Sequence, residues 1–335
     1  MILYVSPEAR GGVDVWMANI HAAMRQAGVA SRLSLLPHRY NFAPFLLPLV
    51  LRGEWAGGAR VVHSGTRAGF ALRASGRALV VTAHHLVADP VYRQYTRPAQ
   101  RAFHRLERAY DGRSIAEADV VTAVSEYTRA RIAEIYGRAD VHVIPNGIDT
   151  SRFRPNAETR PRADHPFRLL FVGNRTRRKG ADLLGPIMAR LGEGYELWYS
   201  GGQRRDEEPI TAPNAKPLGA LSVEELAAAY NSCHALIFPS RLEGFGLAVA
   251  EAMACALPVV ASRCSSLPEL VIDGQGGLLC PVDDVEAFTT AVRRLADDPQ
   301  LRQEMGAFNR TRAEQEYSLS VMAGRYKAIY ARLGA

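Results

Sequence analysis

Cysteine, lysine and long apolar runs are all scarce in this sequence of 335 residues. Its four cysteines show no Cys-x-x-Cys spacing, which argues against a zinc site or a disulfide scaffold and favours a reducing cytoplasm. The most apolar stretch, residues 42–51, holds ten residues and two prolines and is too short to span a bilayer. Residues 1–5 follow no basic segment, so we interpret them as a first strand and not as a signal peptide.

The basic charge is carried almost entirely by arginine and is unevenly placed. Residues 1–165 hold 22 Arg against 14 acidic residues, a formal balance of +8, whereas residues 166–335 hold 19 basic and 20 acidic residues, a balance of −1. A basic first half suggests an anionic partner such as a membrane surface or a phosphorylated acceptor; a coding bias that scatters Arg over a solvated face is the alternative. We expect no nucleic-acid binding, because no interleaved aromatic residues or known motif accompany the charge.

Short β-branched segments alternate with amphipathic ones along the chain. This alternation predicts two doubly wound α/β halves, each with a parallel sheet covered on both faces. Helices are expected over residues 13–27 and 126–136. The expected strands are residues 2–5, 31–36, 60–63, 78–83, 119–124, 141–144, 167–172, 196–199, 235–238 and 258–261. Such sheets bind ligands at the carboxyl ends of their strands, which predicts a site in the cleft where the halves face each other.

The domain boundaries follow from a segment without periodicity. Residues 149–166 contain three prolines and several charges, and we interpret them as a linker. We therefore predict a first domain over residues 1–155 and a second over 166–316. Apolar residues at helical spacing predict a C-terminal helix within 317–335 that docks on the first domain.

The strongest chemical signal is the segment 239–254, in which a strand runs into a glycine-containing turn that opens a helix near Gly246. The amides of residues 244–247 would be unpaired there, and the helix dipole favours an anion beside them. Glu243 and Glu251 flank the turn, where their carboxylates can accept hydrogen bonds from sugar hydroxyls on both sides of a diphosphate. The alternative interpretation is two solvated glutamates around a tight turn.

The segment 243–251 resembles the signature of glycosyltransferase family 4, whose members are retaining enzymes of the GT-B fold. The resemblance spans nearly the whole chain and implies two Rossmann-like domains that face each other across a cleft, with a C-terminal helix crossing back. The first domain would bind the acceptor and the second the nucleotide sugar. Further landmarks in the family's order are residues 11–12, 82–84, 125–127, 144–149, 171–173, 179–180 and 218–219.

The resemblance implies a hexosyltransferase that moves a sugar, with retention, from a UDP- or GDP-linked donor to a hydroxyl acceptor. No metal or other cofactor is expected, and the sequence contains no Asp-x-Asp pair. The implied catalytic residues are Glu243, Lys179 and His84. The implied donor-binding residues are Gly11, Gly12, Asn174, Arg175, Arg178, Gly219, Leu221, Gly244, Phe245, Gly246, Leu247 and Glu251.

Individual roles are implied in the same way. Glu251 would hold the ribose, Glu243 the donor-sugar hydroxyls, and Lys179 would neutralise the diphosphate. The backbone of residues 218–221 would contact the base, and residues 11–12 would close on the phosphates from the opposite domain. His84 would contact the donor sugar or the reaction centre, although a histidine at a strand end is often purely structural.

One position departs from the family pattern. Asn174 stands where the family usually has an arginine. Arg175 or Arg178 would have to replace it, because lysine cannot supply the same bidentate phosphate contact. Without a replacement, the protein could bind nucleotide sugars and be inactive. A sugar-nucleotide epimerase and a nicotinamide dehydrogenase are further alternatives, but residues 11–12 lack the Gly-x-Gly-x-x-Gly spacing of the dehydrogenases.

The sequence indicates less about the acceptor than about the donor. A basic stripe and the apolar segment 42–51 suit a peripheral enzyme acting on lipid-linked or cell-envelope glycan precursors at the inner, anionic face of a membrane. The alternative is solvated helix surface and buried core. The stripe consists of Arg93, Arg97, Arg101, Arg105 and Arg108.

Overall fold

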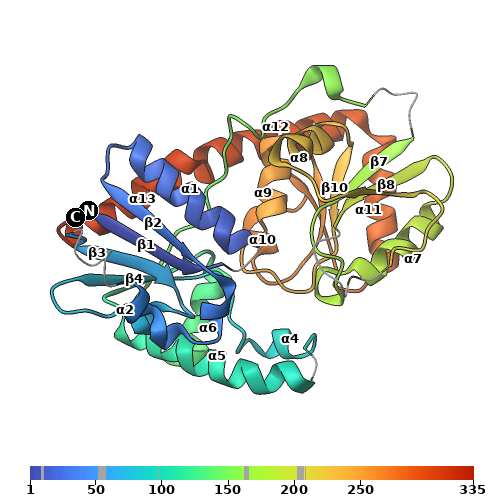
Figure 1. Ribbon diagram of the computed structural model, residues 1–335. Helices are drawn as coiled ribbons and strands as arrows, with labels where there is room; N and C mark the ends of the chain where they lie inside the picture. The colour runs from blue at the N-terminus through green and yellow to red at the C-terminus, as the bar shows by residue number, and fades with distance from the viewer. Residues whose placement is uncertain (9–10, 52–57, 97, 162–165, 202–206, 208) are drawn as a thin grey trace. The chain divides into compact units, whose positions relative to one another are not determined.

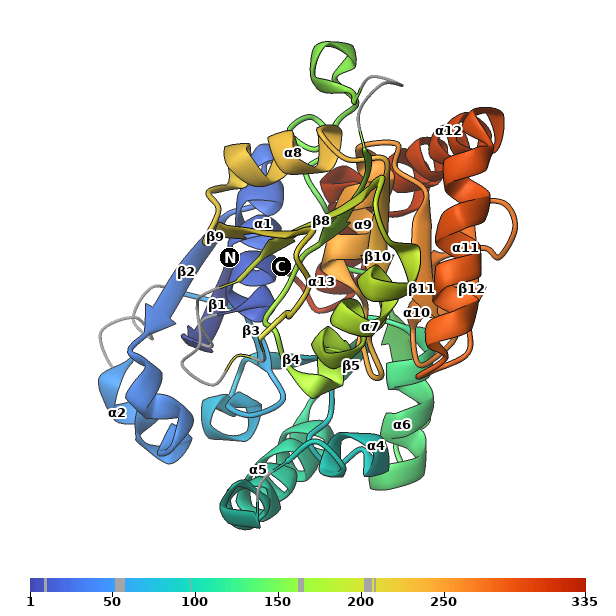
Figure 2. The ribbon, with the colours of Figure 1, turned by 90° about the vertical axis from the view of Figure 1, so that its right-hand side faces the viewer.

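The computed structural model describes residues 1–8, 11–51, 58–96, 98–161, 166–201, 207 and 209–335. The chain forms two compact units (Figures 1 and 2), one of Met1–Gly147 with Leu319–Ala335 and the other of Ile148–Ser318. Each unit holds a six-stranded sheet in which all neighbouring strands are parallel. The predicted pair of doubly wound α/β sheets is confirmed.

The first unit has the strand order β2-β1-β3-β4-β5-β6. Its elements are β1 (Ile2–Pro7), α1 (Gly12–Gln26), β2 (Ser31–Leu36), η1 (His38–Asn41), η2 (Pro44–Leu46), α2 (Leu47–Val50), β3 (Val61–Gly65), η3 (Gly69–Leu72), β4 (Ala78–Ala83), α4 (Pro90–Arg93), α5 (Pro98–Glu117), β5 (Val120–Ala123), α6 (Glu126–Tyr136), β6 (Val141–Val143) and α13 (Leu319–Arg332).

Alternate residues of β1 point into two separate cores of this unit. Ile2 and Tyr4 pack with α1 and α13, whereas Leu3 and Val5 pack with the helices of the other face. Figure 1 shows α1 and α13 on one side of the sheet and α5 and α6 on the other. The near-continuous apolar sequence of β1 follows from this burial on both faces.

Helix α13 is fixed to the first unit by buried hydroxyls as well as by apolar contact. The Tyr330 hydroxyl lies 2.6 Å from His63 Nδ1, and Tyr326 OH lies 3.1 Å from Thr82 Oγ1. Burial lowers the pKa of His63 to about 3, so this imidazole stays neutral and bonds through both nitrogens, the second 2.7 Å from Thr82 Oγ1. The network ties the C-terminal helix to β3 and β4.

The second unit has the strand order β12-β11-β10-β7-β8-β9. Its elements are η4 (Ala157–Thr159), β7 (Phe167–Phe171), η5 (Arg177–Lys179), α7 (Ala181–Leu191), β8 (Tyr195–Ser200), β9 (Ala215–Gly219), α8 (Val223–Asn231), β10 (Ala235–Phe238), α9 (Leu247–Ala254), β11 (Val259–Ser262), α10 (Leu267–Leu270), β12 (Gly277–Cys280), α11 (Val285–Asp297) and α12 (Pro299–Glu316).

Two elements of the second sheet were not predicted. Strand β9 carries Lys216 and Pro217, and β12 has only four residues. Both lie at sheet edges, where strands need neither a long apolar run nor a complete ladder of hydrogen bonds. The weak strand pattern in the sequences of β9 and β12 therefore agrees with their positions at the sheet edges.

The segment interpreted as a linker is in large part packed on the second unit. The Asn231 side-chain amide donates to the Arg154 carbonyl at 2.9 Å, and Asn231 Oδ1 accepts from the Asn156 amide at 2.7 Å. Phe153 is buried. Residues 148–155 were expected with the first domain but belong to the compact unit Ile148–Ser318. The reason is that side chains distant in the sequence form hydrogen bonds with the backbone of this segment.

The predicted basic stripe does not lie on one helix. Asp89 caps α4, which ends at Arg93, and α5 begins with Pro98, whose ring suits the first turn of a helix. Arg93 therefore stands apart from the exposed Arg101, Arg105 and Arg108 on α5. Arg97 lies outside the described residues.

Candidate active site

The turn that follows β10 enters α9 through a glycine with left-handed backbone. Gly246 has φ +106 and is the N-cap of this helix of 8 residues. The first amides of a helix have no carbonyl one turn earlier to bind, so this end of α9 presents N–H donors and the positive end of the dipole. Gly244 and Leu247 are partly exposed, whereas Phe245 is buried against Tyr317.

Glu243, which precedes this helix end, is buried and binds two donors through one oxygen. Its Oε1 lies 2.6 Å from Lys179 Nζ and 2.6 Å from Ser240 Oγ. A guanidinium nitrogen of Arg178 lies 3.8 Å from the same oxygen. The Glu243 amide donates to Ser265 Oγ at 2.9 Å, which fixes the main chain as well. The structure therefore brings the predicted residues Glu243, Lys179 and Arg178 together.

The charges of this cluster depend on one another. Burial lowers the pKa of the Lys179 ammonium, and the Glu243 carboxylate opposes that shift. Burial acts to raise the pKa of Glu243, but the charges of Lys179 and Arg178 outweigh it and lower the pKa overall. The Glu243 carboxylate is therefore ionised near neutral pH, and the ammonium group of Lys179 and the guanidinium of Arg178 both face it. The surplus positive charge can receive an anionic ligand.

Gly180 allows the loop that carries Lys179 to touch the turn after β10. It has φ +71, and a Cβ on it would lie 2.0 Å from the Pro239 carbonyl oxygen. Only a residue without a side chain fits this contact. The same approach is stabilised by the Arg241 amide, which donates to the Arg178 carbonyl at 2.8 Å.

Arg241, which was not among the predicted site residues, is a buried arginine that joins the loop carrying Lys179 to the turn after β10. Arg241 is 7% exposed and donates to both oxygens of Asp182, at 2.6 and 2.9 Å, and to Asp283 at 2.5 Å. It also donates to the Arg177 carbonyl. Arg241 stands inside the segment 239–254, but its partners lie 59 and 42 residues away and carry no local signal.

The two arginines that could replace the family's residue at Asn174 have different surroundings. Arg175 pairs with the buried Glu207 at 2.8 Å and lies over the Tyr199 ring. Arg178 instead donates to the Leu242 carbonyl at 2.6 Å and faces Glu243. Asn174 itself is partly exposed. Of the two, Arg178 is the one beside the Lys179–Glu243 pair.

Glu251 lies on α9 and does not point into bulk solvent. Its Oε2 accepts a hydrogen bond of 2.9 Å from the hydroxyl of the buried Tyr230, and the side chain is partly exposed. Burial raises the pKa of this carboxyl to about 7, and the Tyr230 hydrogen bond opposes the shift. Its protonation state therefore changes near neutral pH. Nothing in the local sequence indicated Tyr230 as its partner.

The remaining residues predicted in the second unit lie at the carboxyl end of β9. Gly219 has φ +74, is exposed, and accepts the Gly201 amide at 3.1 Å. Leu221 is partly exposed and precedes Ser222, the N-cap of α8. Because the sheet is parallel, this strand end shares an edge with the ends of β7 and β10. Base contacts at these residues stay a prediction.

Three predicted residues belong to the first unit. Gly11 and Gly12 are exposed at the start of α1, where the Gly11 amide lies 3.4 Å from Asp14 Oδ2. Their phosphate role stays a prediction. His84 follows β4 and contacts Trp16 edge to face, with ring centroids 4.5 Å apart.

The His84 imidazole is neutral and incompletely bonded. Burial, with a smaller contribution from His85, lowers its pKa to about 3. Its buried Nε2 has no hydrogen-bond partner among the described residues. A neutral imidazole with an unsatisfied nitrogen can accept from, or donate to, a ligand hydroxyl.

The described residues contain neither a metal-binding cluster nor a membrane-spanning helix. No group of three or more His, Cys, Asp or Glu there could hold a metal ion. No helix in the same part of the chain is long and apolar enough to cross a membrane.

Comparison with known families matched both units. Residues 12–152 match the family "Glycosyltransferase Family 4", and residues 166–298 match "Glycosyl transferases group 1".

Two curated mycobacterial relatives show partial similarity. The chain is 34% identical over 219 residues to the GDP-mannose-dependent alpha-(1-6)-phosphatidylinositol monomannoside mannosyltransferase of Mycolicibacterium smegmatis. That alignment covers 58% of this chain and only 57% of the relative, so the chain spans little more than half of its length. It is 29% identical over 333 residues to the glycogen synthase of Mycobacterium tuberculosis, covering 88% of this chain and 78% of that protein.

Solved structures share the fold. Sucrose-phosphate synthase from Thermosynechococcus elongatus superposes with a TM-score of 0.87 at 23% identity, covering 99% of this chain and 98% of that one. HepE of Anabaena, solved in complex with UDP-glucose, superposes with a TM-score of 0.80 at 16% identity, covering 99% of each chain. The fold is thus the GT-B arrangement of two parallel Rossmann-like sheets.

Proposed function

Because the chain belongs to glycosyltransferase family 4, the group 1 glycosyltransferases, which transfer sugars from nucleotide sugars, we propose a specific reaction for it. It is a retaining hexosyltransferase that uses a UDP- or GDP-linked donor and a hydroxyl acceptor and needs no metal. The observation that carries this proposal is the cluster of Lys179, Arg178 and Glu243 next to the N-terminus of α9.

In the proposed donor site, the second unit binds the nucleotide sugar. Lys179 and Arg178 face the diphosphate, and the amides at the start of α9 add uncharged donors. Glu243 accepts from donor-sugar hydroxyls and Glu251 from the ribose. The Lys179–Glu243 contact supports this assignment, because it sets a phosphate partner and a hydroxyl partner side by side at 2.6 Å.

The proposed chemistry needs charge stabilisation more than a strong base. The bond from the sugar's anomeric carbon to the phosphate oxygen breaks, and the acceptor oxygen bonds to the same face of that carbon. The acceptor's proton passes to the departing phosphate oxygen. Lys179, Arg178 and the helix end stabilise the charge that develops on the diphosphate, the role a divalent cation fills in other transferases.

A donor screen tests the proposal. The protein is incubated with UDP- and GDP-sugars in EDTA, and unfolding temperature and release of nucleotide are measured. A matching donor at about 100 times its Kd adds about 2.7 kcal/mol, a shift of several degrees. Release of nucleotide with EDTA present supports a metal-independent transferase. Stabilisation without turnover in the presence of acceptor extracts favours the inactive binding protein, and no stabilisation by any donor contradicts the donor site.

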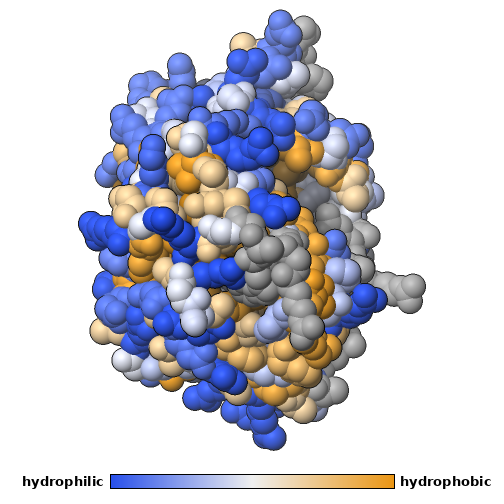
Figure 3. Space-filling model, turned by 60° about the vertical axis from the view of Figure 1, so that its left-hand side comes forward, coloured by the Kyte–Doolittle hydropathy of each residue, from blue (hydrophilic) through white to orange (hydrophobic). Residues whose placement is uncertain are grey.

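A second observation supports a lipid-linked acceptor and a cytoplasmic enzyme at the inner face of a membrane. Phe42, Phe45 and Leu49 are 55–58% exposed. The ring of Phe42 lies 5.2 Å from that of Phe103, which sets this apolar segment against α5 and its exposed arginines. Figure 3 shows apolar side chains among hydrophilic ones on one face of the molecule. Apolar residues next to cations suit an anionic bilayer surface.

Vesicle sedimentation tests the membrane proposal. At low salt the protein should sediment with vesicles of phosphatidylglycerol and phosphatidylcholine more than with phosphatidylcholine alone. Phe45→Ser with Leu49→Ser should reduce binding at least fivefold. Val223→Ser, at an apolar residue 41% exposed on α8, is the matched control and should bind normally. Equal binding by the double variant, or none by the unaltered protein, contradicts a membrane contact through this segment.

A further inference from the structure

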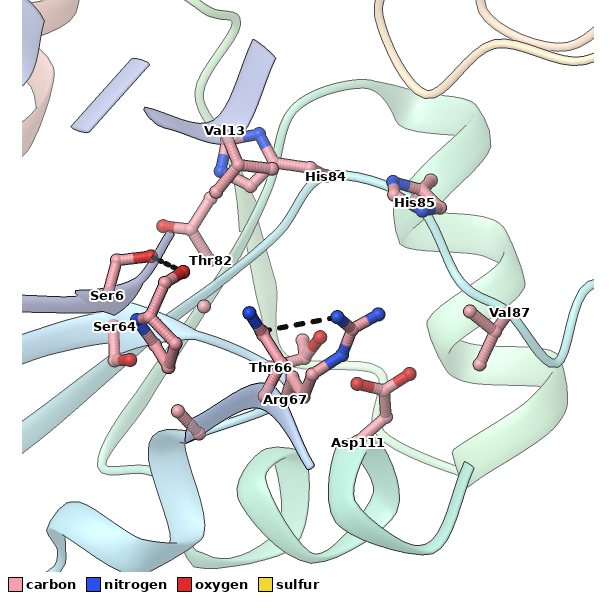
Figure 4. Close-up of a pocket in the computed structure, with 14 residues that line it drawn as sticks. Ser6, Val13, Ser64, Thr66, Arg67, Thr82, His84, His85, Val87 and Asp111 are labelled. Atoms are coloured by element: carbon pink, nitrogen blue, oxygen red, sulfur yellow. Dashed lines mark hydrogen bonds between the residues drawn. The ribbon is translucent and has the colours of Figure 1, made fainter. Parts of the chain in front are cut away.

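A pocket opens at the carboxyl ends of three strands of the first unit (Figure 4). This edge of a parallel sheet is a typical place for ligand sites. Side chains from five segments distant in the sequence meet there. The polar ones are Ser6, Asn41, Ser64, Thr66, Arg67, Thr82, His84, His85 and Asp111.

Two buried polar atoms of this lining lack a partner. Ser64 Oγ and His84 Nε2 are shielded from solvent and form no hydrogen bond with the described residues. Ser64 stands at the end of β3 and His84 just after β4, the neighbouring strand. A buried hydroxyl and imidazole without partners destabilise a fold unless a ligand or water satisfies them. A ligand group that both donates and accepts hydrogen bonds would satisfy Ser64 Oγ and His84 Nε2.

The opposite wall of the pocket is acidic. Asp111, from α5, is 4% exposed; burial raises its pKa to about 7, and a hydrogen bond from the Thr66 hydroxyl opposes that shift. Figure 4 shows its carboxyl beside Arg67. This carboxyl has no part in the chemistry proposed above.

The guanidinium of Arg67, which lines the pocket, is already paired with a carboxylate. Arg67 forms an ion pair with Glu107, which is 2% exposed, and donates to Asn41 Oδ1 at 3.2 Å. The charges of Arg67 and Glu107 cancel, and Asp111 adds a further acidic group. Among the described lining residues, a phosphate would meet Asp111 and an arginine that is already paired with Glu107, whereas uncharged hydroxyls could donate to Asp111 and accept from Arg67.

We propose that this pocket binds the acceptor through an uncharged, hydroxyl-rich ring, with Asp111 and Ser64 as specificity-determining residues. This inference rests on the proposed transferase function and names the acceptor class for it. Asp111 accepts hydrogen bonds from neighbouring ring hydroxyls, and Ser64 and His84 bind a third. Any phosphate or lipid of the acceptor stays outside the pocket.

Ligand-detected and protein-detected NMR on the full chain test the proposal with pairs of probes that share one ring and differ in charge. The probes are neutral methyl hexosides and cyclitols and their phosphate monoesters, at concentrations up to tens of millimolar. At least one neutral probe should show saturation transfer and shift the His84 imidazole resonance, which the His84→Gln variant identifies. Its phosphate monoester should bind at least tenfold more weakly.

Variants locate the binding. Asp111→Asn keeps the shape and one acceptor oxygen but not the charge, and should weaken the neutral probe about tenfold; Ser64→Ala should weaken it about threefold. Glu117→Gln, on the same helix but in a surface ion pair with Arg113, is the matched control and should bind normally. Equal or tighter binding of the phosphate esters overturns the proposal, as do unchanged affinity of Asp111→Asn and failure of every neutral probe to bind.

Nucleotide binding, measured in parallel, distinguishes failure of the acceptor proposal from failure of the donor site. Stabilisation by a nucleotide sugar together with no neutral-probe binding removes only the acceptor proposal. Neutral-probe binding without any nucleotide-sugar binding supports the pocket and contradicts the donor site.

Discussion

Lys179 Nζ lies 2.6 Å from Glu243 Oε1, although 64 residues separate the two in the sequence. The contact joins the loop after β7 to the turn after β10 inside the second unit. It is nearly closed to solvent, with the side chains 18% and 8% exposed. A buried pair of this kind contributes to the stability of the fold and, in the proposed function, to the rate of sugar transfer. These two contributions need separate tests.

Replacing Lys179 by Ala should abolish transfer, with at least a 100-fold loss of kcat, and lower the free energy of unfolding by about 3 kcal/mol, because a buried carboxylate loses its main counter-charge. Adding Glu243→Gln removes that uncompensated charge. The double variant should therefore recover most of the stability and none of the activity, as measured by thermal unfolding and a transfer assay. Lys327→Ala, at an exposed lysine, is the control. Near-normal turnover by Lys179→Ala would contradict the assignment.

The raised pKa of Glu251 predicts a dependence of stability on pH. Its folded-state value of about 7 lies above the ordinary value of 4.5, so the folded protein holds the proton more tightly than the unfolded chain. The stabilising effect of the protonated form is complete below about pH 4.5 and is lost as pH rises to about 7. After allowance for partial exposure, this loss is roughly 1–2 kcal/mol.

Glu251→Gln isolates that contribution, because it removes the titration and keeps the shape. Between pH 4.5 and 7.5 the unfolding free energy of the variant should fall less than that of the unaltered protein. Donor affinity should rise with pH through 7 in the unaltered protein, since ribose hydroxyls donate best to the ionised carboxylate, and should be flat in the variant. Parallel stability curves for the two proteins would show that Glu251 does not titrate in this range.

The close approach at Gly180 can be separated from its backbone conformation. Gly180→Ala forces a Cβ into the Pro239 carbonyl, and Gly137→Ala is the matched control, with the same left-handed backbone (φ +72, ψ 10) and open space around the added Cβ. Both substitutions carry the left-handed strain of about 1 kcal/mol. Only Gly180→Ala should cost a further 2 kcal/mol or more in unfolding free energy and displace Lys179, with a tenfold or greater loss of donor affinity. Equal effects of the two substitutions would contradict the proposed contact.

The sequence predicted the features that rest on local pattern. The short β-branched segments that alternate with amphipathic ones predicted ten of the strands, and the turn chemistry at 239–254 predicted the helix that opens beside Gly246. It did not predict β9 or β12, because edge strands need little apolar pattern. The contacts of Arg241 with Asp182 and of Tyr230 with Glu251 join residues whose proximity depends on the whole sheet. No motif indicated Asp111, because its burial depends on helix packing.

The prediction that Arg178 and not Arg175 contacts the phosphate also needed the tertiary structure, since it rests on the pairing of Arg175 with Glu207. Arg178→Gln should raise the KM for the donor at least tenfold with little loss of stability, because its guanidinium is 29% exposed beside Glu243. Arg175→Gln should leave that KM within about twofold and lower the unfolding free energy by about 2 kcal/mol, because Glu207, 3% exposed, loses its ion pair with Arg175.

Arg178→Lys distinguishes charge from geometry at the same position. If Arg178 replaces the bidentate phosphate donor missing at Asn174, lysine keeps the charge but only one point of contact, and the KM for the donor should lie between those of the unaltered protein and Arg178→Gln. Steady-state kinetics with varied donor measure all three variants. The reverse order, with Arg175→Gln raising KM and Arg178→Gln only destabilising, would assign the phosphate contact to Arg175 and require the Arg175–Glu207 pair to open when the donor binds.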